Sequence, residues 1–558
     1  MSYKKKLVIV LLFAAFVSLN GCKTSKEENN NNENTASTEK PNIILIMSDD
    51  MGYSDLGAYG GEVQTPNLDN LAEDGLKFTQ FYNTARCCPT RASLMTGLYP
   101  HQTGIGHMTN PPNSDQHDMG LPSYRGFMNK DNVTIAEVLR EGGYSTYMSG
   151  KWHLGMEKED QWPLQRGFDH FYGILPGAAN YFKPTSPRGI TVDNKQIEIT
   201  DGDYYITDAF TDNAMKFIDD SQEKEDKKPF FLYLAYTAPH WPLQAPKEDV
   251  DKYRDRYNEG WGAIRKERYK RMEKMGIING DCVLSDQDSP EWESLPKKKR
   301  EEMALRRAIY SAQIDRMDQN IGRLVDHLKE QGLYDNTLLV FLDDNGACAE
   351  GGMLGGGPAK NLETETGYFL SYGQAWANAS NTPFRKYKHW LHEGGIATPL
   401  IIHWPSHIKG EERGKIVREY GFLPDIMATF ADVSGTQYPE TYNGNAIPPM
   451  EGQSLLPLID GDNDQVHKKP IFWEHEGNKA VRLGNYKLVM EWKGKDKNHW
   501  ELYDISKDRS EEHDISGENP KIVKEMRAQW EQWAKDKDVA PWDKIQKIMQ
   551  GKRDKKHG

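Results

Sequence analysis

Cysteine is scarce in this chain, with five cysteines among 558 residues. They are too few and too scattered for a disulfide framework, and none has the spacing of a zinc site. Basic residues do not predominate either, because 70 lysines and arginines stand against 83 acidic residues and leave a net charge of −13. The lack of a basic domain argues against nucleic-acid binding. An acidic surface repels anions on average, so a site for an anionic substrate must be locally positive.

Long apolar runs are also missing, and none is long enough for an ordinary membrane span. The only candidate is Leu7–Leu19, which is too short and follows the basic residues Lys4–Lys6. It leads to Gly21 and Cys22, which is typical of a lipoprotein signal peptide covering residues 1–22, with Cys22 as the lipidated cysteine of a lipobox. A plain signal peptide cleaved nearby is the alternative. We therefore expect a lipoprotein anchored in the bacterial cell envelope, periplasmic or on the outer-membrane surface.

The rest of the chain divides into three segments that differ in composition and in the pattern of apolar residues. Residues 23–40 are polar and rich in asparagine, so they cannot bury a core and we expect a tether. Residues 41–465 alternate apolar strands with helical patterns, which indicates an α/β fold with a largely parallel central sheet flanked by helices. Residues 466–558 predict a small antiparallel sheet with a helix, followed by a basic tail that frays from Lys547. The charged stretch 247–300 interrupts the larger segment, and we interpret it as a solvated helical insertion.

Polar clusters follow several predicted strands of the larger segment directly. These strands are Asn42–Met47, Tyr144–Ser149, Phe230–Tyr236 and Thr337–Leu342. Ligands of parallel α/β sheets bind beyond the carboxyl ends of the strands. The clusters are therefore expected to converge in space.

The segment Cys87–Gly97 is the most informative one. Pro89 restricts the backbone and predicts a helix that runs to about Gly97. A nucleophile at such a helix start faces a positive field suited to an anion, and Arg91 adds a fork-shaped cation for a tetrahedral oxyanion. On these residues alone, two buried free cysteines beside a structural arginine remain an equal explanation.

The segment resembles the type I sulfatase signature, in which Cys-x-Pro-x-Arg is followed by Thr-Gly. The resemblance implies that a maturation enzyme oxidises Cys87 to formylglycine (3-oxoalanine), whose hydrate is the nucleophile. Cys88 takes the variable position, and Thr90 replaces the more usual serine or alanine. The match extends over roughly residues 41–535 and points to arylsulfatase-like bacterial members. It implies an alkaline-phosphatase-like core with a smaller C-terminal domain.

Two acidic pairs match the metal ligands of that family. Asp49 and Asp50 follow the first predicted strand, and Asp344 and Asn345 lie in an Asp-Asn-Gly segment after a later one. The resemblance implies that they bind a cation together with the modified Cys87. Four side-chain oxygens suit Ca²⁺, and Mg²⁺ less well. A helix cap or surface role is the usual explanation for one isolated pair.

Basic residues match the positions at which the family handles sulfate and protons. The resemblance implies that Lys151 and Lys388 stabilise sulfate oxygens and that Arg91 holds the hydrated aldehyde. It further implies that His240 protonates the leaving oxygen and that His153 acts as the base. A strand-like spacing places Lys151 and His153 on one face. A lone histidine after a strand is otherwise more often structural.

The resemblance implies hydrolysis of sulfate esters. Sulfated oligosaccharides are the first expected substrates, with algal polysaccharides such as ulvan as one candidate source, and aryl sulfates are the second. His101, Trp241 and Trp376 are candidate pocket residues, for which core packing is an equal alternative. A phosphonate monoester or phosphodiester hydrolase with the same signature is the nearest rival. A surface lipoprotein that binds sulfated glycans without chemistry is another.

Overall fold

The computed structural model describes residues 40–200, 202–280, 282–367, 369–462, 466–494 and 498–557. The predicted signal peptide, its Cys22 and the predicted tether up to residue 39 lie outside these ranges. None of the helices within the described ranges is both long enough and apolar enough to cross a bilayer. The boundary between residues 465 and 466 stays a prediction.

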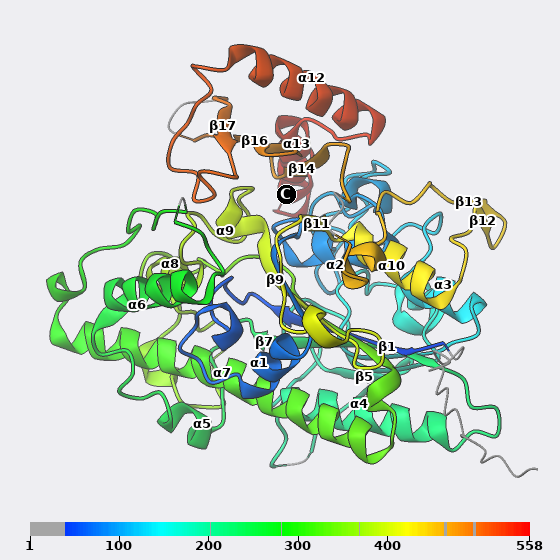
Figure 1. The fold of residues 1–558 in the computed structure, drawn as a ribbon. Coiled ribbons are helices and arrows are strands. Elements are labelled where there is room, and N and C mark those ends of the chain that lie inside the picture. Colours follow the sequence, from blue (N-terminus) through cyan, green and yellow to red (C-terminus); the bar gives the residue numbers. More distant parts are fainter. Residues whose placement is uncertain are drawn as a thin grey trace, which may run out of the picture. The chain divides into compact units, whose positions relative to one another are not determined.

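A large mixed sheet of eleven strands forms the centre of the described chain (Figure 1). The strand order is β10 (Ile416–Val417), β2 (Leu76–Tyr82), β9 (Ala397–His403), β8 (Thr337–Asp343), β1 (Asn42–Asp49), β7 (Phe230–Pro239), β3 (Ser145–Lys151), β4 (His170–Ile174), β5 (Ile190–Val192) and β6 (Lys195–Ile197), and β11 (Gly421–Phe422) pairs with β2. The central run β8-β1-β7-β3-β4 is parallel throughout. Strand β9 is antiparallel to both of its neighbours. The predicted α/β fold with a largely parallel sheet is confirmed.

Strand β1 explains why the sheet has a helix layer on each face. All eight of its residues are buried, as its unbroken apolar run predicts for a strand covered on both sides. Ile44 and Ile46 pack into one hydrophobic cluster, whereas Ile43, Leu45 and Met47 pack into the other. Alternate side chains of a strand point to opposite faces, so one strand supplies both cores.

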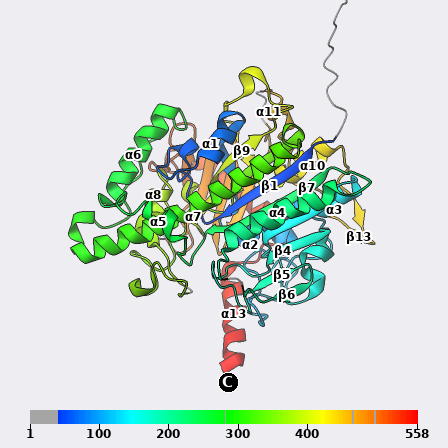
Figure 2. The same cartoon turned by 90° about the horizontal axis from the view of Figure 1, so that it is seen from below.

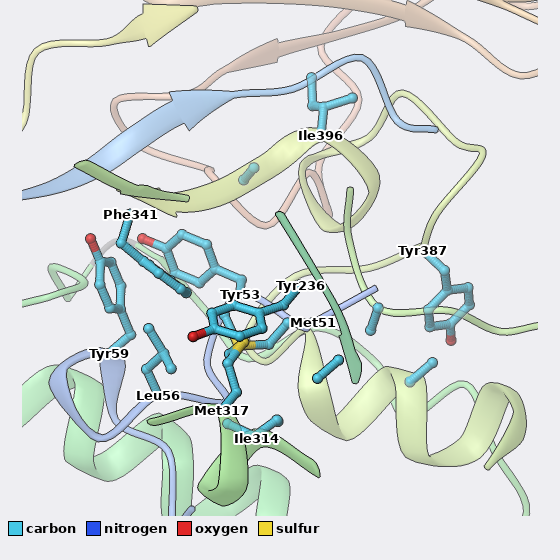
Figure 3. Close-up of a cluster of buried hydrophobic side chains, with 14 of the residues drawn as sticks. Met51, Tyr53, Leu56, Tyr59, Tyr236, Ile314, Met317, Phe341, Tyr387 and Ile396 are labelled. Carbon is cyan, nitrogen blue, oxygen red and sulfur yellow. The ribbon is translucent and has the colours of Figure 1, made fainter. Parts of the chain in front are cut away.

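Helices cover both faces of the sheet, and the two longest of them lie together on one face (Figures 1 and 2). The first layer holds α1 (Pro66–Glu73), α4 (Ile206–Gln222) and α7 (Lys297–Glu330), and the second holds α2 (Cys87–Thr96), α3 (Ile135–Glu141) and α10 (Pro424–Ser434). Figure 3 shows Ile314 and Met317 of α7 beneath Met51 and Tyr53, which follow β1. Helix α7 therefore supports the loop that leaves the central strand.

The charged insertion is helical, as predicted, but it is not merely a solvated face. It contains α5 (Lys247–Asp251), α6 (Gly260–Met275) and the start of α7. Trp261 and Arg268 of α6 are fully buried, and Arg268 pairs with Asp55 at 2.7 Å and with Glu62 at 2.6 Å. The insertion is therefore anchored to the core by an aromatic ring and an ionic network.

The end of the chain forms a four-stranded antiparallel sheet with a helix on it. Its strands are β14 (Ile471–His475), β15 (Asn478–Leu483), β16 (Tyr486–Met490) and β17 (Glu501–Asp504), and its helix is α12 (Pro520–Asp536). The expectation that the tail frays from Lys547 is wrong, because α13 spans Trp542–His557. Trp542 and Ile545 pack against Met119 and Tyr124, a tertiary contact that stabilises this helix.

Smaller elements complete the described fold. They are the hairpin β12 (Thr441–Tyr442) and β13 (Asn445–Ala446) and the short helices α8 (Gly373–Ser380), α9 (Glu393–Ile396) and α11 (Leu456–Ile459). Helices α8 and α9 flank the loop that carries Lys388.

Candidate active site

The polar clusters that follow four parallel strands meet at one edge of the sheet. Lys151 Nζ, at the end of β3, lies 2.6 Å from Oδ2 of Asp49, at the end of β1. Asp50 Oδ2 lies 3.3 Å from Nε2 of His240, a residue just after β7. Asp50 Oδ1 accepts a 2.7 Å hydrogen bond from Asn345, a residue just after β8. The predicted convergence at the carboxyl ends is thus what the structure shows.

A left-handed residue lets both carboxylates at the end of β1 enter the site. Regular strand geometry would send Asp49 and Asp50 to opposite faces of the sheet. Asp50 instead has φ 69°, which breaks the alternation. His153 likewise has φ 56° and lies beyond the end of β3, so the strand spacing predicted for Lys151 and His153 is not what brings them together. A backbone turn does so.

Buried cationic side chains lie beside both Asp344 and Asp50, but they offset the effect of burial on the pKa only at Asp50. Arg91 donates two hydrogen bonds to Asp344 Oδ2, at 2.9 and 3.2 Å, and Lys388 Nζ lies 2.8 Å from Asp50 Oδ1. Burial raises the pKa of Asp344 well above its ordinary value, against the opposing effect of Arg91. At Asp50 burial also acts to raise the pKa, but Lys388 and His240 outweigh it and lower the pKa below its ordinary value. The site therefore has room for one more positive charge near Asp344.

Two buried oxygens in this cluster have no hydrogen-bond partner among the described residues. They are Oδ1 of Asp49 and Oδ1 of Asn345. An unpaired buried acceptor costs about 1–3 kcal/mol, so these atoms are aimed at something that the protein itself does not supply. Asp343 differs, because its Oδ1 accepts hydrogen bonds from Ser48 at 2.6 Å and from the Met51 backbone at 3.2 Å. The open oxygens and the oxygen-only donor set fit a hard divalent cation.

Cys87 is the first residue of α2, which begins two residues before the start predicted from Pro89. Arg86 caps the helix in an extended conformation, and Pro89 stays within the first turn, where no intrahelical donor is lost. Gly97 ends the helix with φ 70°, as predicted. A hydrogen bond from Cys88 is the main cause that holds the pKa of the Cys87 thiol well below its ordinary value, with Lys151 and His153 adding to it against the effect of burial. The Cys87 position therefore stabilises negative charge.

Two buried histidines flank this position and are neutral near pH 7. Burial lowers the pKa of His153 and that of His240 to about 4 each. His240 Nδ1 lies 2.7 Å from the carbonyl oxygen of Trp241, which can only accept, so Nδ1 donates and Nε2 carries the lone pair. His153 packs closely on Gly177, where a Cβ would stand 2.5 Å from its ring. The glycine therefore leaves space for the imidazole.

An open cavity of about 160 Å³ lies over these residues. Four of the predicted catalytic residues line it, namely Cys87, His153, His240 and Lys388. Arg91 and Lys151 lie beneath it, fully buried among the carboxylates. The cavity is smaller than the roughly 300–1,000 Å³ typical of sites for drug-sized ligands.

The wall of the cavity contains residues that the sequence gave no reason to select. Arg86 Nη1 lies 3.1 Å from Glu350 Oε1, and Trp241 Nε1 donates to Glu350 Oε2 at 2.9 Å. Lys388, with Arg86 adding to it, lowers the pKa of Glu350 to about 2 against the effect of burial. The only sequence signal was proximity, since Arg86 precedes Cys87 and Glu350 lies shortly after Asn345.

Two of the three predicted pocket residues belong to the core instead. His101 is buried, lies 2.8 Å from Glu474 and packs on the rings of Tyr124 and Trp533. Trp376 is fully buried and donates to the Met303 carbonyl at 2.7 Å. Both expectations are corrected, because neither residue lines the cavity, and His101 Nε2 and Trp376 Nε1 bond to groups inside the core. Trp241 does line the cavity.

Comparison with known proteins gives consistent matches over most of the chain. Residues 41–436 match the family model described as Sulfatase, and residues 384–536 match the one described as N-sulphoglucosamine sulphohydrolase, C-terminal. The chain is 34% identical to an uncharacterized sulfatase of Schizosaccharomyces pombe, over 89% of this chain and 93% of that protein. It is 34% identical to an arylsulfatase of Klebsiella aerogenes, over 76% of this chain and 92% of that protein.

A solved structure matches as well. It is the crystal structure of Ps i-CgsB in complex with k-i-k-neocarrahexaose. Its sequence is 28% identical to this chain, and the TM-score is 0.66. The match covers 91% of this chain and 99% of that chain.

Proposed function

Because this chain belongs to the sulfatase family and is a sulfuric ester hydrolase, we propose that it desulfates oligosaccharides with a formylglycine at position 87 and a divalent cation. The observation that carries the proposal is the convergence of Cys87, two lysines, two neutral histidines and the carboxylate cluster at one cavity.

The cation would be held by Asp49, Asp50, Asp344 and Asn345, together with residue 87. The unpaired Oδ1 atoms of Asp49 and Asn345 support this ligand set. All-oxygen ligation favours Ca²⁺ over Mg²⁺, because Ca²⁺ accepts an irregular shell. When bound, the cation supplies charge that polarises the sulfate and acidifies the nucleophile.

The nucleophile would come from Cys87 by the action of a maturation enzyme. Once formed, the hydrated formylglycine supplies the attacking oxygen. The position suits an anionic reaction, because it opens helix α2 and the cations of Lys151 and Lys388 act on it. Arg91 is fixed through two hydrogen bonds to Asp344, so we assign it to holding residue 87 in place.

Two lysines are suited to stabilise charge on the sulfuryl oxygens. Lys151 is tied to Asp49 and Lys388 to Asp50, so both ammonium groups are fixed before substrate binds. Asp50 and Glu350 raise the pKa of Lys388 well above its ordinary value, against the effect of burial, so it stays protonated. Donors that are buried and fixed in advance stabilise developing charge strongly.

Two histidines are suited to move protons in opposite directions. His153 is neutral near pH 7, so it can accept a proton from the hydroxyl at residue 87. His240 keeps Nδ1 on the Trp241 carbonyl, so the neutral ring must first take up a proton at Nε2 before it can protonate the leaving oxygen. Asp50, 3.3 Å from Nε2, stabilises the protonated ring that this step needs.

The lining of the cavity favours a sugar sulfate over a small aryl sulfate. Trp241 offers an aromatic face, and Arg86 and Arg188 add positive charge beside Glu350. The similar Ps i-CgsB was solved with an oligosaccharide, k-i-k-neocarrahexaose. We therefore propose a sulfated oligosaccharide as substrate, with fragments of algal polysaccharides such as ulvan among the candidates and aryl sulfates second.

The decisive experiment measures inorganic sulfate released from a panel of sulfated oligosaccharides by protein coexpressed with a maturation enzyme. Cys87→Ala should abolish release, and Cys282→Ala, at a buried cysteine outside the cavity, should keep it. Retained turnover in Cys87→Ala would contradict the proposed formylglycine nucleophile at position 87. Preferred cleavage of phosphonate or phosphate diesters would favour the rival hydrolase, and binding without turnover would favour a glycan-binding protein.

The cellular location is proposed from the sequence of residues 1–22 alone. A lipid on Cys22 would anchor the protein in the bacterial envelope, where polysaccharide fragments are accessible. Metabolic labelling with a fatty acid should mark the native protein and not Cys22→Ser. Labelling of both would exclude this cysteine as the anchor.

A further inference from the structure

A second polar cluster lies beside the cavity and has no part in the proposed mechanism. Three imidazoles surround the carboxylate of Glu476. His389 Nδ1 lies 3.1 Å from Oε2, while His107 Nδ1 and His475 Nε2 lie 3.2 and 3.7 Å from Oε1. The four residues come from three separate segments of the chain, with His475 at the end of β14 and Glu476 in the turn that leads to β15.

The ring nitrogens of this cluster are buried and short of partners. His475 is 1% exposed and His107 is 4% exposed. Both ring nitrogens of His475, and Nε2 of His107, have no hydrogen-bond partner in the described part of the chain. A neutral imidazole always carries one N–H and one lone pair, so leaving both unmatched inside a protein is unfavourable.

We propose that His107, His389, His475 and Glu476 bind a second divalent ion, a nitrogen-preferring metal of the zinc class. A metal takes the lone pair of His475 Nε2, which has no other partner. Three imidazoles and one carboxylate suit Zn²⁺, Ni²⁺ or Cu²⁺ rather than Ca²⁺. The site is therefore chemically distinct from the all-oxygen cluster around Asp50.

The spacing of the side chains fits tetrahedral coordination. Zinc bonds of about 2.0–2.2 Å place neighbouring ligand atoms of a tetrahedron about 3.3–3.5 Å apart. The observed separations of 3.1, 3.2 and 3.7 Å bracket that value. The ligand atoms of His389, His475 and Glu476 all lie within 4.8 Å of one another. His107, whose Nδ1 lies 3.2 Å from Glu476 Oε1, is outside that group, so its ring has to move closer to His389 and His475 to complete the shell.

The backbone holds two of the ligands in strained conformations. His389 has φ 92° and Glu476 has φ 50°, which non-glycine residues adopt rarely because these conformations are strained. Asn478 donates to the His475 carbonyl at 3.0 Å, and its amide nitrogen also lies 3.4 Å from His389 Nε2 and 3.5 Å from His389 O. A metal bound at His389 Nδ1 leaves the ring proton on Nε2, so Nε2 can no longer accept a hydrogen bond from the Asn478 amide. That amide would then donate to the His389 carbonyl instead.

The ion would act as a structural clamp. Four protein ligands leave no open position for substrate, as in structural zinc sites. His389 directly follows Lys388, and His107 packs on the cavity residue His117 with ring centroids 4.9 Å apart. The clamp would fix the active-site lysine and the cavity wall to the C-terminal sheet.

The test uses the full-length matured protein stripped of metal by a chelator. Calcium chloride is added back in excess to fill the oxygen site, and cobalt chloride is then titrated as the spectroscopic probe. We expect one equivalent of Co²⁺ with the intense visible bands of tetrahedral coordination. His475→Gln and Glu476→Gln should each weaken binding by more than ~100-fold, because even outer-sphere changes cost 10–100-fold. His499→Gln, at an exposed histidine paired with Asp514, is the matched control and should bind as wild type.

Anomalous diffraction at the cobalt edge from wild-type crystals keeps the test independent of variant folding. A peak between His389, His475 and Glu476 supports the site. The absence of such a peak, or a cobalt spectrum unchanged in both variants, overturns it. Neither readout depends on sulfatase turnover, so the clamp and the proposed activity can fail separately.

Discussion

His153 is a base whose protonation state is determined by burial. Its pKa is about 4, because the surrounding protein disfavours the charged ring more strongly than Cys87 favours it. We expect kcat/KM to be level from neutral pH down to about 5 and to fall as the pH drops below about 4, since a protonated ring cannot accept a proton. The measurement is a pH profile with an aryl sulfate at saturating calcium.

Circular dichroism at each pH distinguishes this acidic fall in kcat/KM from acid unfolding of the protein. The acidic groups of the wall do not confuse the result, because Lys388 holds the pKa of Glu350 near 2 against burial. A limb centred near 6.5, the ordinary histidine value, would contradict the assignment of His153 as a buried base.

The residue scale also shows what a sequence can and cannot predict about a site. Asp49 and Asn345 were predictable because each follows an unbroken apolar strand, and strand ends converge in a parallel sheet. Trp376 and His101 were not, because an aromatic or imidazole side chain gives no sign of whether its polar atom finds a partner inside the core. Glu350 was missed because it lies in a loop without a regular pattern.

At the scale of elements, helix α7 positions the loop that carries the carboxylates. The Tyr310 hydroxyl donates to the Asp50 carbonyl at 3.2 Å and lies 2.8 Å from Asp55 Oδ2. Tyr310→Phe removes these bonds and keeps the ring, so we expect cation affinity to fall by about 10–100-fold, as for other outer-sphere partners. Turnover at saturating calcium should stay close to wild type.

The measurement is a calcium titration of turnover after chelation, with Tyr334→Phe as the control. Tyr334 follows α7, bonds His403 at 2.7 Å and is not among the residues that line the cavity. An unchanged calcium dependence in Tyr310→Phe would show that α7 supports the fold without tuning the site.

Elements were predictable where local chemistry determines them. A threonine at 134 followed by a glutamate at 137 is the sequence pattern of a capping box, and α3 begins with this box, whose reciprocal bonds are 3.0 and 2.8 Å long. Helix α13 was missed, because its stability comes from Trp542 packing on a distant segment. The buried face of α6 was missed for the same reason, since Arg268 gains its partners Asp55 and Glu62 only in the folded chain.

At the scale of the whole described structure, buried charges join the C-terminal sheet to the catalytic core. Lys487 of β16 lies 2.9 Å from Glu393 of α9 and 2.8 Å from Glu511, all fully buried. Burial acts to raise the pKa of Glu393, but Lys487 and Arg509 outweigh it and lower the pKa to about 2, from an ordinary 4.5. A lowered carboxyl pKa contributes stability that is present above pH 4.5 and is lost as the pH falls towards 2. Acid therefore weakens the joint between the two sheets.

This joint predicts that the chain from Lys40 onward unfolds as one unit. Lys487→Met leaves Glu393 and Glu511 buried without their shared cation, and such a change costs about 3–5 kcal/mol. In urea we expect a single transition, shifted to lower concentration, when tryptophan fluorescence and circular dichroism are followed together. Lys521→Met, at an exposed lysine of α12, should shift stability by no more than about 0.5 kcal/mol. Two separate transitions would instead support residues 466–558 as an independently folding domain, with the charge network as a contact between two stable parts.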